Sequence, residues 1–197
     1  MECALCLTVQ PFGVACVACG TQFGRYACTL CRFFDDDCRK QQFHCEKCGI
    51  CRVGGRDSFS HCDTCGCCYS NAIAHSHTCV ERSTHSNCPV CLQFLFESIR
   101  PVSVLGCGHT IHEHCFLSLF AHHQFTCPTC SRSMCDMSGV WARRDAEIAA
   151  TPMPDEYARV RVKIVCSDCS ALAEVPWNVL GMKCPVSDCG SYNTRRI

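Results

Sequence analysis

The sequence has 197 residues, 26 of them cysteine, and its 18 Lys and Arg residues balance its 18 Asp and Glu residues to a formal net charge of zero. This neutrality argues against a non-specific nucleic-acid binder, which needs an excess of basic side chains. Cysteine supplies much of the 48% hydrophobic fraction, so ordinary apolar side chains are too few for a sizeable core. Metal ions or disulfides must therefore hold the chain together.

The N-terminus and the cysteine spacing both favour metal over disulfides. The first twenty residues contain four cysteines and no unbroken apolar stretch, which is unlike a secretory signal. No segment approaches the roughly 18 apolar residues of a membrane span. Ten cysteine pairs are separated by two residues, whereas chance gives about three. Because two thiolates so spaced reach one ion at about 2.3 Å, we expect a soluble, intracellular zinc protein without a membrane partner.

In chain order, the type of cysteine pair divides the chain into four groups. Plain pairs occupy residues 3–19, mixed Cys and His clusters residues 23–81, a third rhythm residues 87–133, and a last group residues 165–192. An apolar stripe predicts a helix over residues 116–123, beginning just after Cys115. Ser138 is expected to cap a second helix that ends before Pro152. Alternating apolar and basic residues over 159–165 predict a strand.

The third group carries the most specific pattern, in which two histidines lie between pairs of cysteines. Its eight residues resemble the cross-brace of a RING finger: Cys88, Cys91, Cys107, His109, His112, Cys115, Cys127 and Cys130. The resemblance implies that the first and third pairs share one zinc ion and the second and fourth pairs share the other. His114 competes with His112 as the middle histidine, and the family spacing favours His112.

RING fingers recruit a ubiquitin-conjugating enzyme, and the resemblance assigns this contact to five residues. Val90 matches the apolar residue of the first pair and Pro128 the proline of the last pair, while Phe116 and Leu119 are candidates for the groove wall. Many RING ligases carry a basic residue directly after the last ligand. Here that residue is Ser131, and Arg132 comes one position late. The resemblance implies no catalytic nucleophile in this chain, because ubiquitin is carried as a thioester on the partner.

The second group resembles the CTCHY zinc finger. Its ligands are Cys28, Cys31, His44, Cys45, Cys48, Cys51, His61, Cys62, Cys65, Cys68, His77 and Cys79. Taken in chain order by fours, the simplest partition, they make three tetrahedral sites. The first group, Cys3, Cys6, Cys16 and Cys19, resembles the last site of a CHY finger, whose earlier half would lie upstream of Met1.

The last group resembles the C-terminal zinc ribbon of CHY-type RING ubiquitin ligases. Its ligands are Cys166, Cys169, Cys184 and Cys189, and four residues rather than two separate the last pair. The whole ligand set suffices for about seven zinc ions with four ligands each. Cys38, Cys67 and Cys135 remain as surplus thiols.

The expected architecture is a series of small metal-stabilised modules of irregular α+β structure. Its parts are a partial CHY finger (1–21), a CTCHY finger (22–86), a RING finger (87–134), a helical linker (135–157) and a zinc ribbon (158–197). The expected function is that of a RING-type ubiquitin ligase of nucleus and cytoplasm. It would bind a charged conjugating enzyme and ubiquitin, with the flanking fingers holding a protein substrate for degradation. The alternatives are a non-catalytic zinc adaptor and a metal- or redox-responsive interaction protein.

Overall fold

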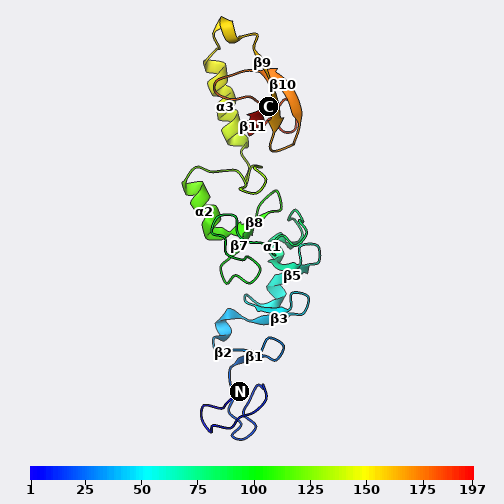
Figure 1. Ribbon diagram of the computed structural model, residues 1–197, viewed down its shortest axis with the longest axis vertical. Helices are drawn as coiled ribbons and strands as arrows, with labels where there is room; N and C mark the ends of the chain where they lie inside the picture. Colours follow the sequence, from blue (N-terminus) through cyan, green and yellow to red (C-terminus); the bar gives the residue numbers. More distant parts are fainter. The chain divides into compact units, whose positions relative to one another are not determined.

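The computed structural model describes residues 1–197 and divides them into two compact units, Met1–Thr84 and His85–Ile197. Both units consist of short antiparallel strands, brief helices and long irregular segments (Figure 1). This confirms the α+β architecture of small metal-binding modules that the sequence predicts. None of its helices has the length and apolar character needed to cross a membrane.

The first unit contains three consecutive two-stranded hairpins. They pair β1 (Tyr26–Cys28) with β2 (Phe33–Asp35), β3 (Phe43–Cys45) with β4 (Ile50–Arg52), and β5 (Phe59–Cys62) with β6 (Cys67–Ser70). One-turn 3-10 helices lie between the hairpins, at Cys38–Lys40 after β2 and at Arg56–Ser58 after β4. The short helix α1 (Asn71–Ala74) begins where the Ser70 hydroxyl accepts a hydrogen bond from the Ala72 N–H. Single β-bridges, Glu2 to Val9 and Ala15 to Gln22, close two loops before the first hairpin.

Aromatic rings supply most of the ordinary packing in this unit. Phe34 stacks on Phe12 with ring centroids 4.7 Å apart and lies 5.9 Å from Phe23. Phe43 is buried with Cys45 and Cys68, and its ring lies 5.9 Å from Phe59. The apolar clusters are therefore small satellites beside the cysteines, as the low content of apolar side chains predicts.

The second unit begins with the hairpin of β7 (Val102–Val104) and β8 (Thr110–His112), followed by α2 (Glu113–Ala121). Leu95, Leu105, Ile111 and Met134 form its core together with three buried cysteines. The helix begins before Cys115 rather than after it, because the chain is already helical beyond the extended residue His112. Glu113 in the first turn suits the positive end of the helix dipole.

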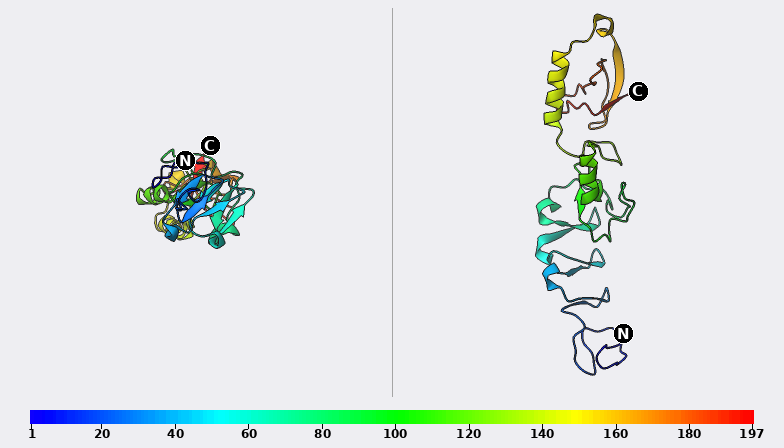
Figure 2. Two further views of the ribbon diagram at one scale, coloured as in Figure 1. Left: turned by 90° about the horizontal axis from the view of Figure 1, so that it is seen from below. Right: turned by 90° about the vertical axis from the view of Figure 1, so that its left-hand side faces the viewer.

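The rest of the second unit is one longer helix and a three-stranded antiparallel sheet. The helix is α3 (Ser138–Ala150), and the sheet has the order β10 (Leu172–Pro176), β9 (Arg161–Cys166), β11 (Thr194–Arg196). A 3-10 turn at Asp155–Tyr157 lies between helix and sheet in the chain. In both figures α3 runs beside this sheet (Figures 1 and 2).

The prediction that Ser138 caps α3 is wrong. The N-cap position belongs to Met137, whose side chain makes no capping hydrogen bond. Ser138 is the first helical residue, and its N–H donates to the Asp136 carboxylate over 2.9 Å. The cap therefore comes from Asp136, two residues before the first helical residue.

Candidate metal centres

The two outer cysteine pairs of the RING segment, Cys88 with Cys91 and Cys127 with Cys130, fold into the same tight turn. In the turn of Cys127, the Ser131 N–H donates to the Cys127 carbonyl over 2.8 Å, and Ser131 adopts a left-handed backbone with φ 62°. Leu92 repeats this arrangement after Cys91, with φ 61° and a 2.9 Å bond to the Cys88 carbonyl. The turn brings the two sulfurs of a pair to one side, as the spacing predicts.

Backbone N–H groups inside these turns also point at sulfur. The Cys31 N–H donates to Cys28 Sγ over 3.4 Å, and this bond is the main reason why the pKa of the Cys28 thiol is lowered. The turn therefore favours a thiolate, the form of cysteine that binds metal.

In the first unit, the structure groups the candidate ligands differently from the chain-order partition. Cys3, Cys6, Cys16 and Cys19 lie together as expected. The three following groups interleave along the chain: Cys28, Cys31, His44 and Cys51; Cys45, Cys48, His61 and Cys68; Cys62, Cys65, His77 and Cys79. The partition by consecutive fours is therefore wrong.

The β-hairpins explain this interleaving. His44 and Cys45 are neighbours on β3, and successive side chains of a strand point to opposite faces. His44 lies opposite Cys51 in the register of β3 and β4, so these two residues join the preceding group. Cys45 faces the other way and joins the following one. The β5–β6 hairpin repeats the pattern, with His61 opposite Cys68.

The distances between donor atoms fit tetrahedral zinc. Bonds of about 2.3 Å from one ion to four sulfurs place neighbouring sulfurs about 3.8 Å apart. Cys3 Sγ lies 3.7 Å from Cys19 Sγ, and Cys6 Sγ lies 3.4 Å from Cys16 Sγ. Cys48 Sγ lies 3.3 Å from His61 Nδ1. All cysteines are free of disulfides, and sulfur with imidazole nitrogen is a donor set that zinc prefers.

The second unit contains the cross-braced pair of centres. One group is Cys88, Cys91, His112 and Cys115, with His112 Nδ1 lying 3.2 Å from Cys91 Sγ. In the other, His109 Nδ1 lies 3.5 Å from Cys107 Sγ and 3.8 Å from Cys127 Sγ. Cys130 contributes its thiol beside Cys107. The first and third pairs thus lie apart from the second and fourth, as the RING resemblance implies.

The thiols of the first RING group favour opposite protonation states. Although burial opposes ionisation, the N–H groups of Cys91, His112 and Val90 lower the pKa of Cys88 to about 6. Burial and the thiols of Cys91 and Cys88 raise the pKa of Cys115 to about 12. Close thiolates repel each other, so full ionisation of the group calls for a cation among them.

His112, rather than its neighbour His114, joins the first RING group. The His112 side chain is fully buried, and its Nε2 lies 2.8 Å from Ser98 Oγ. With a metal on Nδ1, Nε2 carries the proton and donates to Ser98, which fixes the ring orientation. His114 is exposed, and its Nε2 lies 3.2 Å from an Arg100 guanidinium nitrogen. Ser98 was not identified from the sequence, because a lone serine in a loop carries no spacing signal.

The ribbon cysteines come together despite the longer spacing of the last pair. Cys166 Sγ lies 3.7 Å from Cys189 Sγ, and Cys169 Sγ lies 3.5 Å from Cys184 Sγ. The Cys184 N–H donates to the Ser191 carbonyl, and Gly190 takes the left-handed backbone after Cys189 with φ 52°. The four intervening residues therefore form a looser loop that still presents both sulfurs.

The five residues assigned to partner contact divide into exposed and packed ones. Val90 is 40% exposed, and Pro128 and Arg132 are also exposed. Phe116 and Leu119 are half-buried and pack against the core cluster. Among the large apolar side chains of α2, Leu117 is the most exposed at 59%. It lies off the apolar stripe, so the sequence pattern does not single it out.

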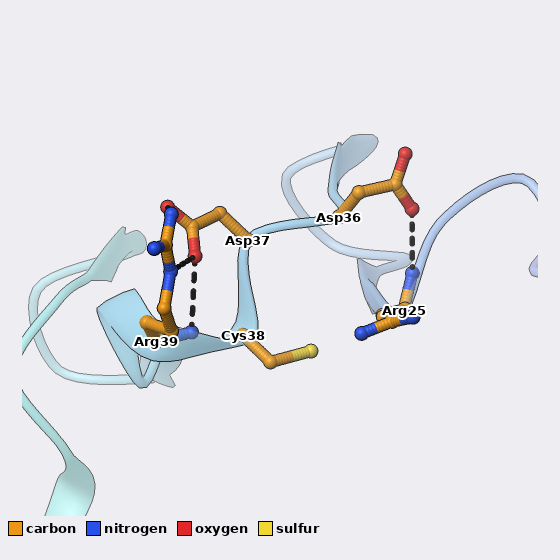
Figure 3. A pocket seen from close by; sticks show the side chains of 5 residues that line it. All are labelled: Arg25, Asp36, Asp37, Cys38 and Arg39. Atoms are coloured by element: carbon orange, nitrogen blue, oxygen red, sulfur yellow. Dashed lines mark hydrogen bonds and ion pairs between the residues drawn. The ribbon is translucent and has the colours of Figure 1, made fainter.

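The surplus cysteines lie outside these groups. Cys67 is buried in β6, and Cys135 is exposed with its thiol 3.6 Å from Met137 Sδ. Cys38 lies in an open surface hollow lined by Arg25, Asp36, Asp37 and Arg39 (Figure 3). The carboxylates there already accept bonds from the Arg25 backbone and the Arg39 guanidinium. The hollow therefore has the character of a solvated loop.

Comparison with known proteins supports the assignment of the second unit. A Ring finger domain model matches residues 86–131, and a zinc-ribbon model matches residues 135–195. The E3 ubiquitin-protein ligase RZFP34 of Arabidopsis thaliana is 48% identical over 194 residues, which are 98% of this chain and 66% of that protein. The E3 ubiquitin-protein ligase SRFP1 of Oryza sativa subsp. japonica is 47% identical over 195 residues, which are 99% of this chain and 74% of that protein.

A longer relative shares the same region. Zinc finger protein BRUTUS of Arabidopsis thaliana is 40% identical over 203 residues, which are 100% of this chain but 16% of that protein. The chain thus spans about two thirds of RZFP34 and a larger part of SRFP1. With this identity and coverage, and with metal groups in both matched segments, the chain belongs to the family of RING-finger E3 ubiquitin-protein ligases that includes SRFP1 and RZFP34.

Proposed function

We propose that this protein is a RING-type ubiquitin ligase that binds a ubiquitin-charged conjugating enzyme and promotes transfer of ubiquitin to a protein substrate. The observation that carries the proposal is the cross-braced pair of Cys and His groups with an exposed Val90 between two ligands. Family membership and the names of SRFP1 and RZFP34 support it.

The chemistry asked of this chain is positioning. Val90, Pro128 and α2 would bind the conjugating enzyme, and Arg132 would hold enzyme and ubiquitin in the reactive arrangement. Restricting this geometry lowers the barrier for attack by a substrate amine without a nucleophile from the ligase. Each metal group offers four protein ligands, so a bound zinc ion supplies structure, by holding the turns that present these residues.

The first unit belongs to the same proposal as the substrate-binding part. Its four groups of Cys and His residues would be the CHY and CTCHY fingers that the sequence resembles. Together with the second unit they would hold about seven zinc ions. Substrate would be marked for proteasomal degradation in nucleus and cytoplasm. Fluorescence microscopy of the tagged protein would test the location. The lifetime of the substrate in cells from which this ligase is deleted would test the degradation.

The ligase activity itself is tested by discharge of ubiquitin from charged conjugating enzymes. Val90 and Val186 offer a matched pair, because each follows Cys-Pro and they are 40% and 41% exposed. Only Val90 lies in the RING. Truncating an apolar side chain in an interface core costs about 1 to 2 kcal/mol, so Val90→Ala should slow discharge by about tenfold. Val186→Ala should discharge at the rate of the wild type.

Zinc content measured for each variant separates loss of contact from loss of fold. Both variants are expected to retain the metal content of the wild type, since neither residue is a ligand. Equal discharge by wild type and Val90→Ala would contradict the proposed contact. A wild type inactive with every conjugating enzyme in a panel would contradict the ligase proposal and favour a zinc-dependent adaptor.

A further inference from the structure

One carboxylate of the ribbon, that of Asp168, accepts hydrogen bonds from two different modules of the second unit. From the ribbon, the Ser191 hydroxyl donates to it over 2.6 Å and the Asn193 side-chain amide over 3.0 Å. From the segment after the last RING ligand, Ser133 donates its N–H over 2.7 Å and its hydroxyl over 3.0 Å. The carboxylate is thus saturated with donors, and such charge-assisted bonds are stronger than neutral ones.

A second bond ties the same two modules. The Asn193 side-chain amide also donates to the Ser131 carbonyl over 2.7 Å. Asn193 is thereby shared between Asp168 and the left-handed residue that follows Cys130. Ser191 is 1% exposed, so the ribbon side of this network is closely packed. The contacts span 35 residues to Ser133 and 62 residues to Ser131 along the chain.

The RING segment held by this network carries the residues assigned to partner contact. Pro128 lies inside the last cysteine pair and Arg132 lies between the two serines that Asp168 and Asn193 bind. The Arg132 carbonyl accepts from the Cys127 N–H over 2.7 Å, so its backbone is fixed from both sides. Fixing the backbone of Arg132 limits where its exposed side chain can reach.

We propose that the ribbon is a positioning element of the RING, in which Asp168 holds residues 127–133 so that Pro128 and Arg132 are presented to the charged conjugating enzyme. This role rests on the proposed ligase function. Arg132, one position after the usual basic site, is thereby anchored through its backbone by another module.

The test is a double-mutant cycle in the full-length chain, read as the turnover number for discharge at saturating charged enzyme. Asp168→Asn keeps the shape of the side chain but places an amide N–H₂ against the donors of Ser133 and Ser191. If Asp168 acts through Arg132, Asp168→Asn should lower the turnover number by about tenfold alone. In an Arg132→Ala background it should lower it little further. Additive losses in the cycle would contradict this role.

Two further measurements separate positioning from general damage. Asp188→Asn is the matched control, because Asp188 is an exposed ribbon aspartate beside Cys189 and bonds only to Ser187. It should leave turnover unchanged. Zinc content should stay the same in all variants, while NMR relaxation should show increased motion of amides 127–133 in Asp168→Asn. Unchanged relaxation in this segment would contradict the role without reference to any activity.

The outcomes distinguish this inference from the proposed function. An active wild type with equally active Asp168→Asn contradicts the positioning role alone. A wild type that discharges no conjugating enzyme contradicts the ligase function and this role with it.

Discussion

The imidazole of His112 lies between two partners. Its Nδ1 is 3.2 Å from Cys91 Sγ of the first RING group, and its Nε2 is 2.8 Å from the Ser98 hydroxyl. A hydroxyl that accepts from the second nitrogen of a ligating histidine fixes the tautomer and orientation of its ring. Ser98 lies in the loop before β7, so it links the loop to the first RING centre.

Ser98→Ala should therefore weaken zinc binding at the first RING centre, by about 10- to 100-fold. The affinity is measured by competition with a chromophoric chelator. Ser118→Ala on α2 is the control, because Ser118 is exposed and its side chain contacts no ligand. Equal affinities of the two variants would show that the Ser98 hydroxyl does not support His112.

At the scale of single residues, cysteine and histidine spacing predicts the metal ligands. It does not predict the residues that hydrogen-bond to those ligands or to the segments that carry them. The places of Cys88 and His112 follow from short-range turns that the chain itself specifies. Ser98 and Asp168 act through contacts with residues 14 to 35 positions away. Serine and aspartate are common in loops, so nothing in the sequence singles out these two.

At the scale of elements, β3 and β5 explain why ligands adjacent in the chain serve different ions. His44 and Cys45 are one residue apart and lie on opposite faces of one strand. The sequence predicts the ligands of this region but not their grouping, because the partition by fours ignores strand alternation. The grouping follows once residues 43–45 are a strand, because His44 and Cys45 then point to opposite faces.

Helix α3 has no buried residue, so a few polar contacts hold it to the ribbon. Lys183 Nζ lies 2.7 Å from the Asp145 carboxylate, and the Tyr192 hydroxyl donates to the same carboxylate over 2.7 Å. Trp141 and Tyr192 add a ring contact at 6.0 Å. Lys183 and Tyr192 lower the pKa of Asp145, so this attraction is present above the ordinary aspartate pKa of about 3.9 and is lost only below it.

Asp145→Ala should therefore loosen α3 at neutral pH without releasing zinc. Amide hydrogen exchange within α3 is expected to become severalfold faster, while exchange in β9 stays the same. Glu147→Ala is the control, because Glu147 lies on the same helix and pairs only with Arg144. Exchange rates in α3 that do not change in Asp145→Ala would contradict this account of how the helix is held.

At the scale of the whole molecule, the interleaved groups couple the three metal centres of residues 28–79 within the first unit. Each of the β3–β4 and β5–β6 hairpins supplies ligands to two successive centres, whereas no metal group draws residues from both units. Metal binding and folding are coupled in small modules of this kind. Loss of one centre should spread to its neighbours in the first unit and stop at its boundary.

Cys45→Ser tests this expectation. The variant should lose the metal centre of Cys45, Cys48, His61 and Cys68 and weaken the two centres that share a hairpin with it. The second unit should keep its zinc and its dispersed amide spectrum. Native mass spectrometry counts the ions, and NMR reports on each unit. Cys38→Ser, at an exposed surplus thiol, should change neither measurement. Loss of the second unit's spectrum in Cys45→Ser would contradict the independence of the units.

The left-handed residue that ends each cysteine turn has a further consequence for how such a chain can vary. Glycine fills this position at Gly20, Gly49, Gly66 and Gly190, but Leu7, Arg32, Leu92, Ser131 and Ser170 fill it elsewhere. A left-handed backbone costs a non-glycine residue about 1 to 2 kcal/mol, which is small beside the apparent binding free energy of about 10 to 16 kcal/mol for a structural zinc ion. The turn therefore tolerates many side chains at this position. Leu7 and Leu92 are about 70% exposed, so a side chain at this position faces solvent. New surface chemistry can be introduced there by single substitutions while the ligands stay fixed.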